Sequence, residues 1–347
     1  MNHLFSMDYC DSQGRPMPEM DMTVFDSEKE AVDYYFEWYR KHGYPSVELS
    51  DYCPEAELRE LKAFDETSLI HDEIIEQSML GCGFLWSFFP HWIDVPTWND
   101  GSLADNWNDD KKLRSLMKKT YRFCMNYENA KWSVNRIRQN AKVYCSKQAP
   151  SNFRPTVAKY LYNAYGDYGS VYDPCGGWGG RLFGFMASNA RSYVCCEPST
   201  KTAEGLNRMK QVYAYIGKDV EIKCECAEDY IPKDNVFDMA FTSPPYFDTE
   251  KYSSEPTQSY LRYPKYGKWI EGFLKPVIQN CHKGLKDCGY LLLNVANTKT
   301  APTLEKDTVS IARETGFELK EVLQMVLSSI AGKGIKTEPV FVFEAIK

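Results

Sequence analysis

The second half of the chain alternates short apolar runs with stretches in which apolar residues recur at helical spacing. Short apolar runs bounded by polar residues or glycine are typical of buried parallel strands, and the stretches between them of helices that cover a sheet. The pattern predicts a strand that begins at residue 171 and further strands at 192–196, 220–224, 236–241 and 289–295. It predicts helices at 269–285 and 310–315.

The first half shows a weaker pattern. Residues 32–39 and 55–64 have helical spacing, 90–92 and 96–101 are typical of loops, and 86–92 are strongly aromatic. Between 111 and 150, apolar residues such as Leu113 and Met117 recur at helical spacing, which predicts one or two amphipathic helices. The amino-terminal region is too hydrophobic to be simply disordered. Either a recognition or partner-binding domain, or an extension packed on the sheet, fits it.

One apolar run, 236–241, leads into Thr242-Ser243-Pro244-Pro245-Tyr246. The prolines fix φ near about −65° and lack N–H groups, so this turn presents carbonyl oxygens with little competition. Ligands of open α/β sheets bind at such strand ends. There the Ser243 hydroxyl and the Pro244 carbonyl could accept hydrogens from a planar amino group, while Tyr246 stacks on its ring. The alternative interpretation is an ordinary strand-ending turn.

A glycine-rich turn precedes this motif in the chain. Residues 171–182 read as a strand, four glycines within five positions, and the start of a helix. The spacing fits neither G-x-G-x-x-G nor a phosphate-binding Gly-Lys-Ser/Thr loop. The remaining interpretation is a ligand-binding turn preceded by the acid Asp173, which favours a cationic or zwitterionic cofactor. Glu197 follows the next strand, where an acid can bind ribose hydroxyls. A helix-capping Asp173 and a solvated Glu197 are the alternatives.

Residues 151–347 resemble the S-adenosylmethionine-dependent amino-methyltransferases that act on DNA. The resemblance covers slightly more than half of the chain and rests on two motifs, D-P-x-x-G-x-G from Asp173 and S-P-P-Y from Ser243. It implies an α/β fold of the class I methyltransferase, Rossmann-like type: a doubly wound, mostly parallel sheet of seven strands with helices on both faces. It also implies a helix at 157–165 and an antiparallel strand pair at 319–327 and 340–345. The helical spacing in the first half of the chain predicts a mainly helical amino-terminal extension.

The resemblance assigns a role to each residue that matches the family's motifs. The implied cofactor-binding residues are Arg154, Pro155, Asp173, Pro174, Cys175, Gly176, Gly177, Gly179, Glu197, Pro198, Ala227, Glu228 and Ser243. The implied catalytic residues are Ser243, Pro244, Pro245 and Tyr246. Residues 227–229 match the adenine-contacting turn. Trp178 is a departure, because the family often has a small residue at this place in the glycine loop.

The reaction that the resemblance implies is methyl transfer from S-adenosylmethionine to the exocyclic amino group of a DNA base. Such a nitrogen is a poor nucleophile, so hydrogen-bond acceptors and alignment must activate it. The base has to leave the duplex stack, which costs roughly a few kcal/mol. Serine before Pro-Pro-Tyr is typical of cytosine N4 enzymes and aspartate of adenine N6 enzymes, so cytosine is favoured. An RNA or protein-glutamine methyltransferase, or a non-catalytic nucleic-acid-binding relative, is the alternative.

Composition limits the functional classes further. A chain of 347 residues has room for two domains. No apolar run approaches a membrane span and no basic-then-apolar leader opens the chain, so we expect a cytoplasmic protein. The twelve cysteines include no Cys-x-x-Cys, which predicts reduced thiols and no metal site. A cognate restriction endonuclease or a recognition subunit would be a partner typical of the family.

The net charge of −7 is unevenly distributed. Residues 1–110 hold 24 acidic and 6 basic side chains, whereas 111–150 hold 11 basic and one acidic. We therefore expect an acidic, mainly helical region at 1–110, a basic helical segment at 111–150 and a methyltransferase domain at 151–347. The basic segment suits a phosphate backbone, although a charge run is often only a solvated face. The expected nucleic-acid contacts are Lys118, Lys119, Arg122, Arg136, Arg138, Lys251 and Arg262.

A polar, tyrosine-rich segment, 247–268, follows the S-P-P-Y motif. Long loops inside a compact domain are usually functional. Its position predicts a lid that closes on the flipped nucleotide. A surface excursion with exposed tyrosines is the alternative.

Overall fold

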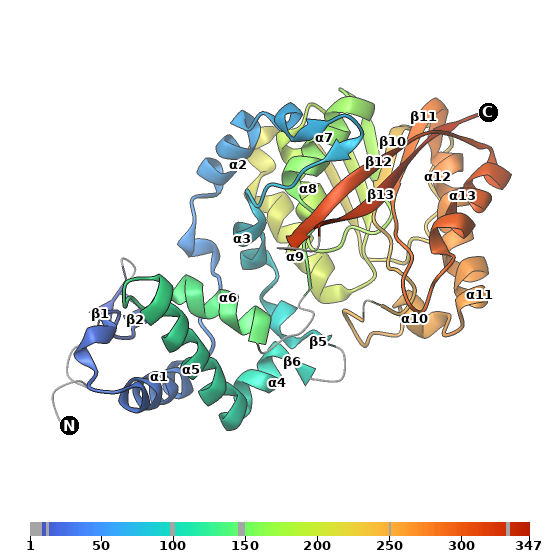
Figure 1. The fold of residues 1–347 in the computed structure, drawn as a ribbon. Helices are drawn as coiled ribbons and strands as arrows, with labels where there is room; N and C mark the ends of the chain where they lie inside the picture. Colours follow the sequence, from blue (N-terminus) through green and yellow to red (C-terminus); the bar gives the residue numbers. More distant parts are fainter. Residues whose placement is uncertain (1–8, 12–13, 98–100, 145–149, 250, 331–333) are drawn as a thin grey trace. The chain divides into compact units, whose positions relative to one another are not determined.

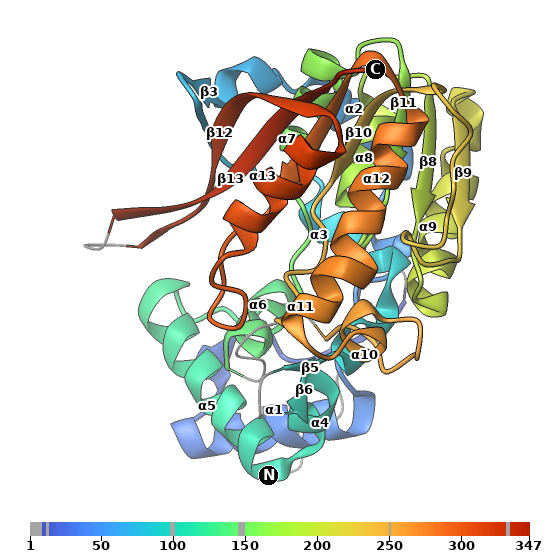
Figure 2. The same ribbon diagram turned by 90° about the vertical axis from the view of Figure 1, so that its right-hand side faces the viewer.

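Figures 1 and 2 show the chain as a computed structural model. It describes residues 9–347 apart from 12–13, 98–100, 145–149, 250 and 331–333. Internal contacts divide the chain into two units. The helical unit comprises 1–46 and 91–150, and the sheet unit comprises 47–90 and 151–347. The boundary expected after residue 150 coincides with a boundary between the units. The boundary expected after residue 110 does not, because 91–150 belongs to one unit and 47–90 packs with the sheet.

Within the described residues, a nine-stranded sheet organises the sheet unit, in the order β3-β4-β12-β13-β11-β10-β7-β8-β9. The strands are β3 (Ile70–His71), β4 (Ile74–Ile75), β7 (Ser170–Asp173), β8 (Ser192–Cys196), β9 (Asp219–Lys223), β10 (Phe237–Thr242), β11 (Leu285–Asn294), β12 (Phe317–Ile330) and β13 (Gly334–Ala345). Strands β7 to β11 pair in parallel, and β13 runs antiparallel to β11 and β12. The doubly wound, mostly parallel sheet with its antiparallel pair is confirmed.

The two short edge strands β3 and β4 are not predicted by the sequence pattern. Ile74 of β4 pairs in parallel with Gln324 of β12, and the side chain of Gln77 donates to the Val326 carbonyl. A two-residue strand is too short to show a period, so only its distant partner determines it. These contacts hold the segment 47–90 against the sheet.

Helices cover both faces of the sheet (Figures 1 and 2). One face carries α7 (Pro155–Tyr165), α8 (Gly180–Ala187) and α9 (Thr200–Val212), with α2 (Pro54–Ala63) packed on α8. The other carries α11 (Tyr266–Trp269), α12 (Lys275–Gly284) and α13 (Leu304–Thr315). The short helices α3 (Cys82–Leu85) and α10 (Ser259–Arg262) lie in connections. Because the chain winds from β7 toward β9 and then from β10 in the opposite direction, right-handed crossovers place helices on opposite faces.

The helical unit is built around buried aromatic rings. Its helices are α1 (Glu28–His42), α4 (Leu103–Asn108), α5 (Asp110–Tyr127) and α6 (Val134–Tyr144), and its short strand pairs are β1 (Tyr9–Cys10) with β2 (Pro16–Met17) and β5 (Pro96–Thr97) with β6 (Gly101–Ser102). Trp132 stacks on Tyr35 with ring centroids 3.6 Å apart, and its indole N–H donates to the Tyr39 hydroxyl at 3.1 Å. The helices expected at 32–39 and within 111–150 are confirmed.

The charges of the helical unit balance. Residues 1–46 and 91–150 contain 15 acidic and 15 basic side chains. Glu28 on α1 forms ion pairs with Lys118 at 3.3 Å and Arg122 at 2.7 Å on α5, and Arg114 of α5 pairs with Asp33 of α1. The strong charge segregation along the sequence is therefore cancelled within the folded unit.

Candidate active site

Three motif segments meet at the carboxyl edge of the sheet. The glycine loop follows β7, Glu197 follows β8 and Ser243 follows β10. Strand β7 pairs with both β8 and β10, so the three segments converge where the strand order reverses, which is the ligand-binding position of open α/β sheets. Two cavities lie there, and all their lining residues belong to the sheet unit.

The first, which we call the acidic cavity, contains Glu197 and Glu228 in its wall. The sequence-predicted cofactor residues that line it are Pro174, Cys175, Gly177, Glu197, Pro198, Ala227, Glu228 and Ser243, and the predicted catalytic residue Pro245 lines it too. Residues from three strand ends and from the turn after β9 thus form one binding wall. The structure brings together most of the sequence-predicted cofactor residues.

Glu197 is the most constrained acid of this cavity. Its carboxylate accepts hydrogen bonds from the backbone N–H groups of Gly177 and Ser199, both at 2.9 Å. Gly177 has φ of +58°, a conformation that glycine adopts without strain. Burial raises the pKa of Glu197 to about 7, although the two N–H donors act in the opposite direction. A ligand that donates hydroxyl groups would favour the ionised form.

Asp173 lies behind the glycine loop and lines neither cavity. It is fully buried, and Arg181 donates to it from Nε at 2.8 Å and from Nη2 at 3.2 Å. The Tyr193 hydroxyl donates to the same carboxylate at 2.6 Å, and the backbone N–H of Cys175 at 3.2 Å. Its oxygens are therefore engaged inside the protein. Asp173 fixes the loop from behind rather than facing a ligand.

The second cavity, which we call the polar cavity, lies on the other side of Ser243. Tyr246, Asn294 and Glu338 contribute to its wall. The Tyr246 hydroxyl lies within hydrogen-bonding distance of the Asn294 carbonyl oxygen, at 3.2 Å, and of the Glu338 carboxyl, at 3.1 Å. Burial raises the pKa of Glu338, which favours a proton on this carboxyl. The tethered Tyr246 ring forms a fixed wall of the cavity.

The segment before α7 contributes to the polar cavity instead of the acidic one. Arg154 and Asn152 both line it, with the Arg154 guanidinium donating to the Gln77 side chain at 3.2 Å. A Cβ atom on Gly180 would lie 2.0 Å from the Phe153 carbonyl oxygen, so glycine is required where this segment crosses the loop. Pro155 starts α7 and lines neither cavity. Among the two expected cofactor residues of this segment, Arg154 thus lines the polar cavity and Pro155 lines neither cavity.

Other predicted residues occupy supporting positions. Gly176 lines the polar cavity, whereas Gly179 and the buried Pro244 line neither. Trp178 lines both cavities and contacts the rings of Trp86, Phe89 and Tyr252. The amino-terminal segment 47–90 thus provides the aromatic surroundings that allow a tryptophan inside the glycine loop.

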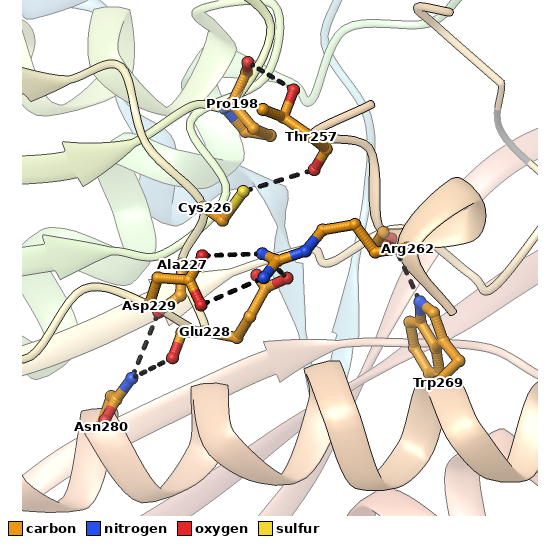
Figure 3. Close-up of polar contacts among 10 residues, drawn as sticks. Pro198, Cys226, Ala227, Glu228, Asp229, Thr257, Arg262, Trp269 and Asn280 are labelled. Carbon is orange, nitrogen blue, oxygen red and sulfur yellow. Dashed lines mark hydrogen bonds and ion pairs between the residues drawn. The ribbon is translucent and has the colours of Figure 1, made fainter. Parts of the chain in front are cut away.

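The segment 247–268 contributes mainly to the acidic cavity. Tyr252, Thr257, Gln258, Ser259 and Tyr260 line that cavity, and only Tyr252 among the described residues of the segment also lines the polar one. The segment expected to form a lid therefore lies mainly along the acidic cavity. Figure 3 shows how its contacts reach the turn at 226–229.

The expected nucleic-acid contacts do not form one free basic surface. Arg262 is paired with Glu228 at 2.6 Å and Asp229 at 2.8 Å (Figure 3). Arg136 pairs with Glu128, Arg138 donates to the carbonyl oxygens of residues 45 and 46, and Lys119 lies over the Tyr144 ring. Lys118 and Arg122 share Glu28, and Lys251 lies 5.7 Å from the Tyr260 ring centroid.

Sequence reasoning missed several cavity residues. Gln77, Asn152, Asn294, Glu338 and Gln258 were not predicted. Asn294 ends β11, so the rule that ligands bind at the carboxyl ends of parallel strands could have found it. Gln77 and Glu338 come from an edge segment and an antiparallel strand, where no sequence signal marks them.

Two side-chain amides have unused hydrogen-bonding capacity within the described part of the chain. Both polar side-chain atoms of Asn152 are buried without a partner, and so is Nε2 of Gln258. Asn152 lines the polar cavity and Gln258 the acidic one. Buried polar groups are normally satisfied, so unsatisfied ones beside a cavity indicate ligand-binding positions.

In the described residues, no cluster of His, Cys, Asp or Glu could hold a metal ion, and no helix could cross a membrane.

Comparisons with known proteins give similarity at the level of structure only. No protein-family model matches the sequence, and no curated protein matches it. A SAM-dependent O-methyltransferase from Thermotoga maritima is 12% identical, with a TM-score of 0.40. The match covers 60% of this chain and 71% of the Thermotoga protein. A SAM-dependent methyltransferase from Methanosarcina mazei is 15% identical, with a TM-score of 0.37, covering 54% and 97%. The [4+2]-cyclase SpnF is 13% identical, with a TM-score of 0.40, covering 55% and 80%.

These similarities are too low to identify a reaction. The strand order and the antiparallel β12–β13 pair of the chain itself define its class I methyltransferase, Rossmann-like fold. Function depends on the site that the fold carries.

Proposed function

We propose that this protein is an S-adenosylmethionine-dependent methyltransferase that methylates the exocyclic amino group of a DNA base, cytosine N4 in preference to adenine N6. The observation that carries the proposal is the position of Ser243. It lines both the acidic and the polar cavity, so that its hydroxyl belongs to the wall between a donor site and an acceptor site. The S-P-P-Y motif supports the choice of an amino nitrogen.

The acidic cavity fits the cofactor. Glu197 has carboxylate oxygens suited to ribose hydroxyls, and Gln258 has a buried N–H donor without a partner among the described residues. S-adenosylmethionine supplies an electrophilic methyl group when bound. The residues that would hold its adenosine part are Glu197, Pro198, Ala227 and Gln258.

The polar cavity fits a planar base. The fixed Tyr246 ring offers a stacking surface, while the Ser243 hydroxyl accepts an amino hydrogen and localises the nitrogen lone pair. The S-P-P-Y motif implies the same role for the Pro244 carbonyl, although Pro244 does not line this cavity. Asn152 adds a donor and an acceptor that the described protein residues leave unused. Catalysis then consists of alignment and electrostatic orientation, without a strong base.

The test is a substrate survey with tritiated S-adenosylmethionine. Wild-type protein is incubated separately with amplified, unmodified duplex DNA, with tRNA and with protein extract, and the DNA is digested to nucleosides. We expect label in N4-methylcytosine. Label in N6-methyladenine would overturn the choice of base, and label only in RNA or protein would overturn the DNA substrate.

Ser243→Ala tests the role of the hydroxyl. We expect turnover to fall by about 100-fold because an oriented hydrogen-bonding group is lost, while the cofactor Kd changes by less than about twofold. Ser310→Ala, an exposed serine on α13, is the matched control and should behave like wild type. A large loss of cofactor affinity with unchanged turnover would contradict the proposed role.

A further inference from the structure

A strap, residues 252–262, forms part of the wall of the acidic cavity. One anchor is at the start of α9, where the Glu255 carboxylate accepts from the Thr200 backbone N–H at 3.1 Å and hydroxyl at 2.9 Å. The next is the Thr257 hydroxyl, which donates to the Pro198 carbonyl at 3.0 Å (Figure 3). Both contacts tie the strap to the segment that follows Glu197.

The other end of the strap holds the turn after β9. Arg262 forms ion pairs with Glu228 and Asp229, and the thiol of Cys226 donates to the Thr257 carbonyl at 3.4 Å (Figure 3). From the opposite side, Asn280 of α12 donates to the carbonyl oxygens of residues 227 and 228. The turn is therefore fixed from two directions.

The strap's unused donor lies between these anchors. Gln258 lines the acidic cavity, and its Nε2 atom is buried with no partner among the described residues. An unpartnered buried donor costs free energy that a ligand acceptor would recover. Glu197 and Glu228 share this wall and offer carboxyl oxygens to the hydroxyl and amino groups of an adenosine.

We infer that the strap completes the binding site for the adenosine part of the cofactor, with Gln258 donating a hydrogen bond to it and Arg262 acting as a positioning residue for the turn 227–229. The identity of the ligand rests on the proposed function. Arg262 thereby belongs to the cofactor site and not to a nucleic-acid surface.

The role of Arg262 follows from the burial of its partner. The Glu228 side chain is only 4% exposed, and burial raises its pKa. Without Arg262 the Glu228 carboxylate would lose its cationic partner and take up a proton more readily. The turn would then lose the contact that joins it to the strap. A defect in cofactor binding is the expected consequence.

Calorimetry with S-adenosylmethionine and S-adenosylhomocysteine tests this inference without a methyl acceptor. We expect Arg262→Met to raise both Kd values by about tenfold, because hydrogen bonds to charged groups are lost. Arg262→Lys, which keeps the charge but not the fork of donors, should give an intermediate value. Lys268→Met removes an exposed charge six positions further along the chain and should leave both Kd values unchanged.

Gln258→Leu separates a ligand-binding amide from a structural one. We expect cofactor Kd values to rise by about five- to tenfold, while the melting temperature of the cofactor-free protein rises by about 2–4 °C because the unpartnered donor is removed. A fall in that melting temperature together with an unchanged Kd would overturn the role of Gln258.

Kinetics distinguish positioning from a general structural defect. With an acceptor that the wild-type protein methylates, Arg262→Met should raise KM for the cofactor and change kcat by less than about twofold. Unchanged cofactor affinity, with a DNA-binding salt slope reduced by about one, would overturn the inference and make Arg262 a phosphate contact. If the wild-type protein binds the cofactor but methylates no DNA, the proposed DNA substrate is wrong. The calorimetry then still tests whether the strap contributes to cofactor binding.

Discussion

A buried ion pair in the sheet unit and an exposed ion-pair cluster in the helical unit show two different uses of charged side chains. In the sheet unit, Asp173 and Arg181 pair in the interior and hold the glycine loop from behind. In the helical unit, Glu28 pairs with Lys118 and Arg122 at the surface, where all three remain partly exposed. A buried pair fixes geometry because breaking it leaves a charge without water, whereas a surface pair is easily replaced by solvent. The buried pair therefore determines the local structure, whereas the exposed side chains mainly neutralise one another's charge.

The largest expected effect follows from breaking the buried pair. Asp173→Ala should lower the free energy of unfolding by about 3–5 kcal/mol, because the Arg181 guanidinium stays buried without its partner. Urea unfolding of the variant measures the loss. Cofactor binding should also be lost, as a consequence of the displaced loop.

Glu28→Ala is the matched change in the helical unit. It removes an acid with two basic partners, Lys118 and Arg122, and it should shift the melting temperature by no more than about 2 °C because exposed ion pairs contribute little. If both variants lost similar stability, the contrast between the two units would be wrong.

The pH dependence of Glu197 is the largest expected effect after the loss of Asp173. Its pKa rises from 4.5 to about 7 on folding, so the folded state holds the proton more tightly than the unfolded state. The contribution to stability is complete below pH 4.5 and is lost as pH rises through about 7, with a total of about 3 kcal/mol. Thermal unfolding of the cofactor-free protein between pH 5 and 8 would detect it.

Cofactor affinity should have the opposite pH dependence. In the proposed site, ribose hydroxyls would donate to the ionised Glu197 carboxylate, so affinity should rise with pH and level off above about 7. Glu197→Gln should bind more weakly and remove this dependence, because the amide does not titrate. Calorimetry at several pH values checks both expectations, and a pH-dependent affinity that persists in Glu197→Gln would assign the titration to another group.

The smallest expected effect concerns the surface charges of α5. Neutralising Lys118, Lys119 and Arg122 should weaken duplex DNA binding and flatten its salt dependence. The effect should be smaller than for three free cations, since Glu28 already pairs with two of them. Glu28→Gln should act in the opposite direction. Unchanged salt slopes in both variants, measured by fluorescence anisotropy, would make α5 a solvated face.

Many strands of the sheet could be predicted from the sequence, because the periodicity of apolar residues is a local property of each strand. The strand at 192–196 is predicted to the residue, and the glycine loop and Ser243 fall at the expected strand ends. The strands β3 and β4 were not predictable, since each has two residues and exists through its pairing partner. Likewise, nothing in the sequence near Gln258 shows that its amide faces a cavity.

Arg262 illustrates the limit most clearly. As a basic residue in a tyrosine-rich loop after the S-P-P-Y motif, it suggested a phosphate contact. The structure instead places it against Glu228 and Asp229. Electrostatic partners depend on distance in space, and separation along the chain gives no estimate of it.

The sequence by itself determined the class of fold and the motif residues at the strand ends, because strand burial and turn chemistry are set by neighbouring residues. Only the tertiary structure decided which charges are neutralised, which residues share a cavity and where the strap lies. Residues 1–46 and 91–150 together carry no net charge, although a stretch of 40 residues within them is strongly basic. Charge balance and cavity walls are properties of segments that meet through folding, so they became visible only in the folded chain.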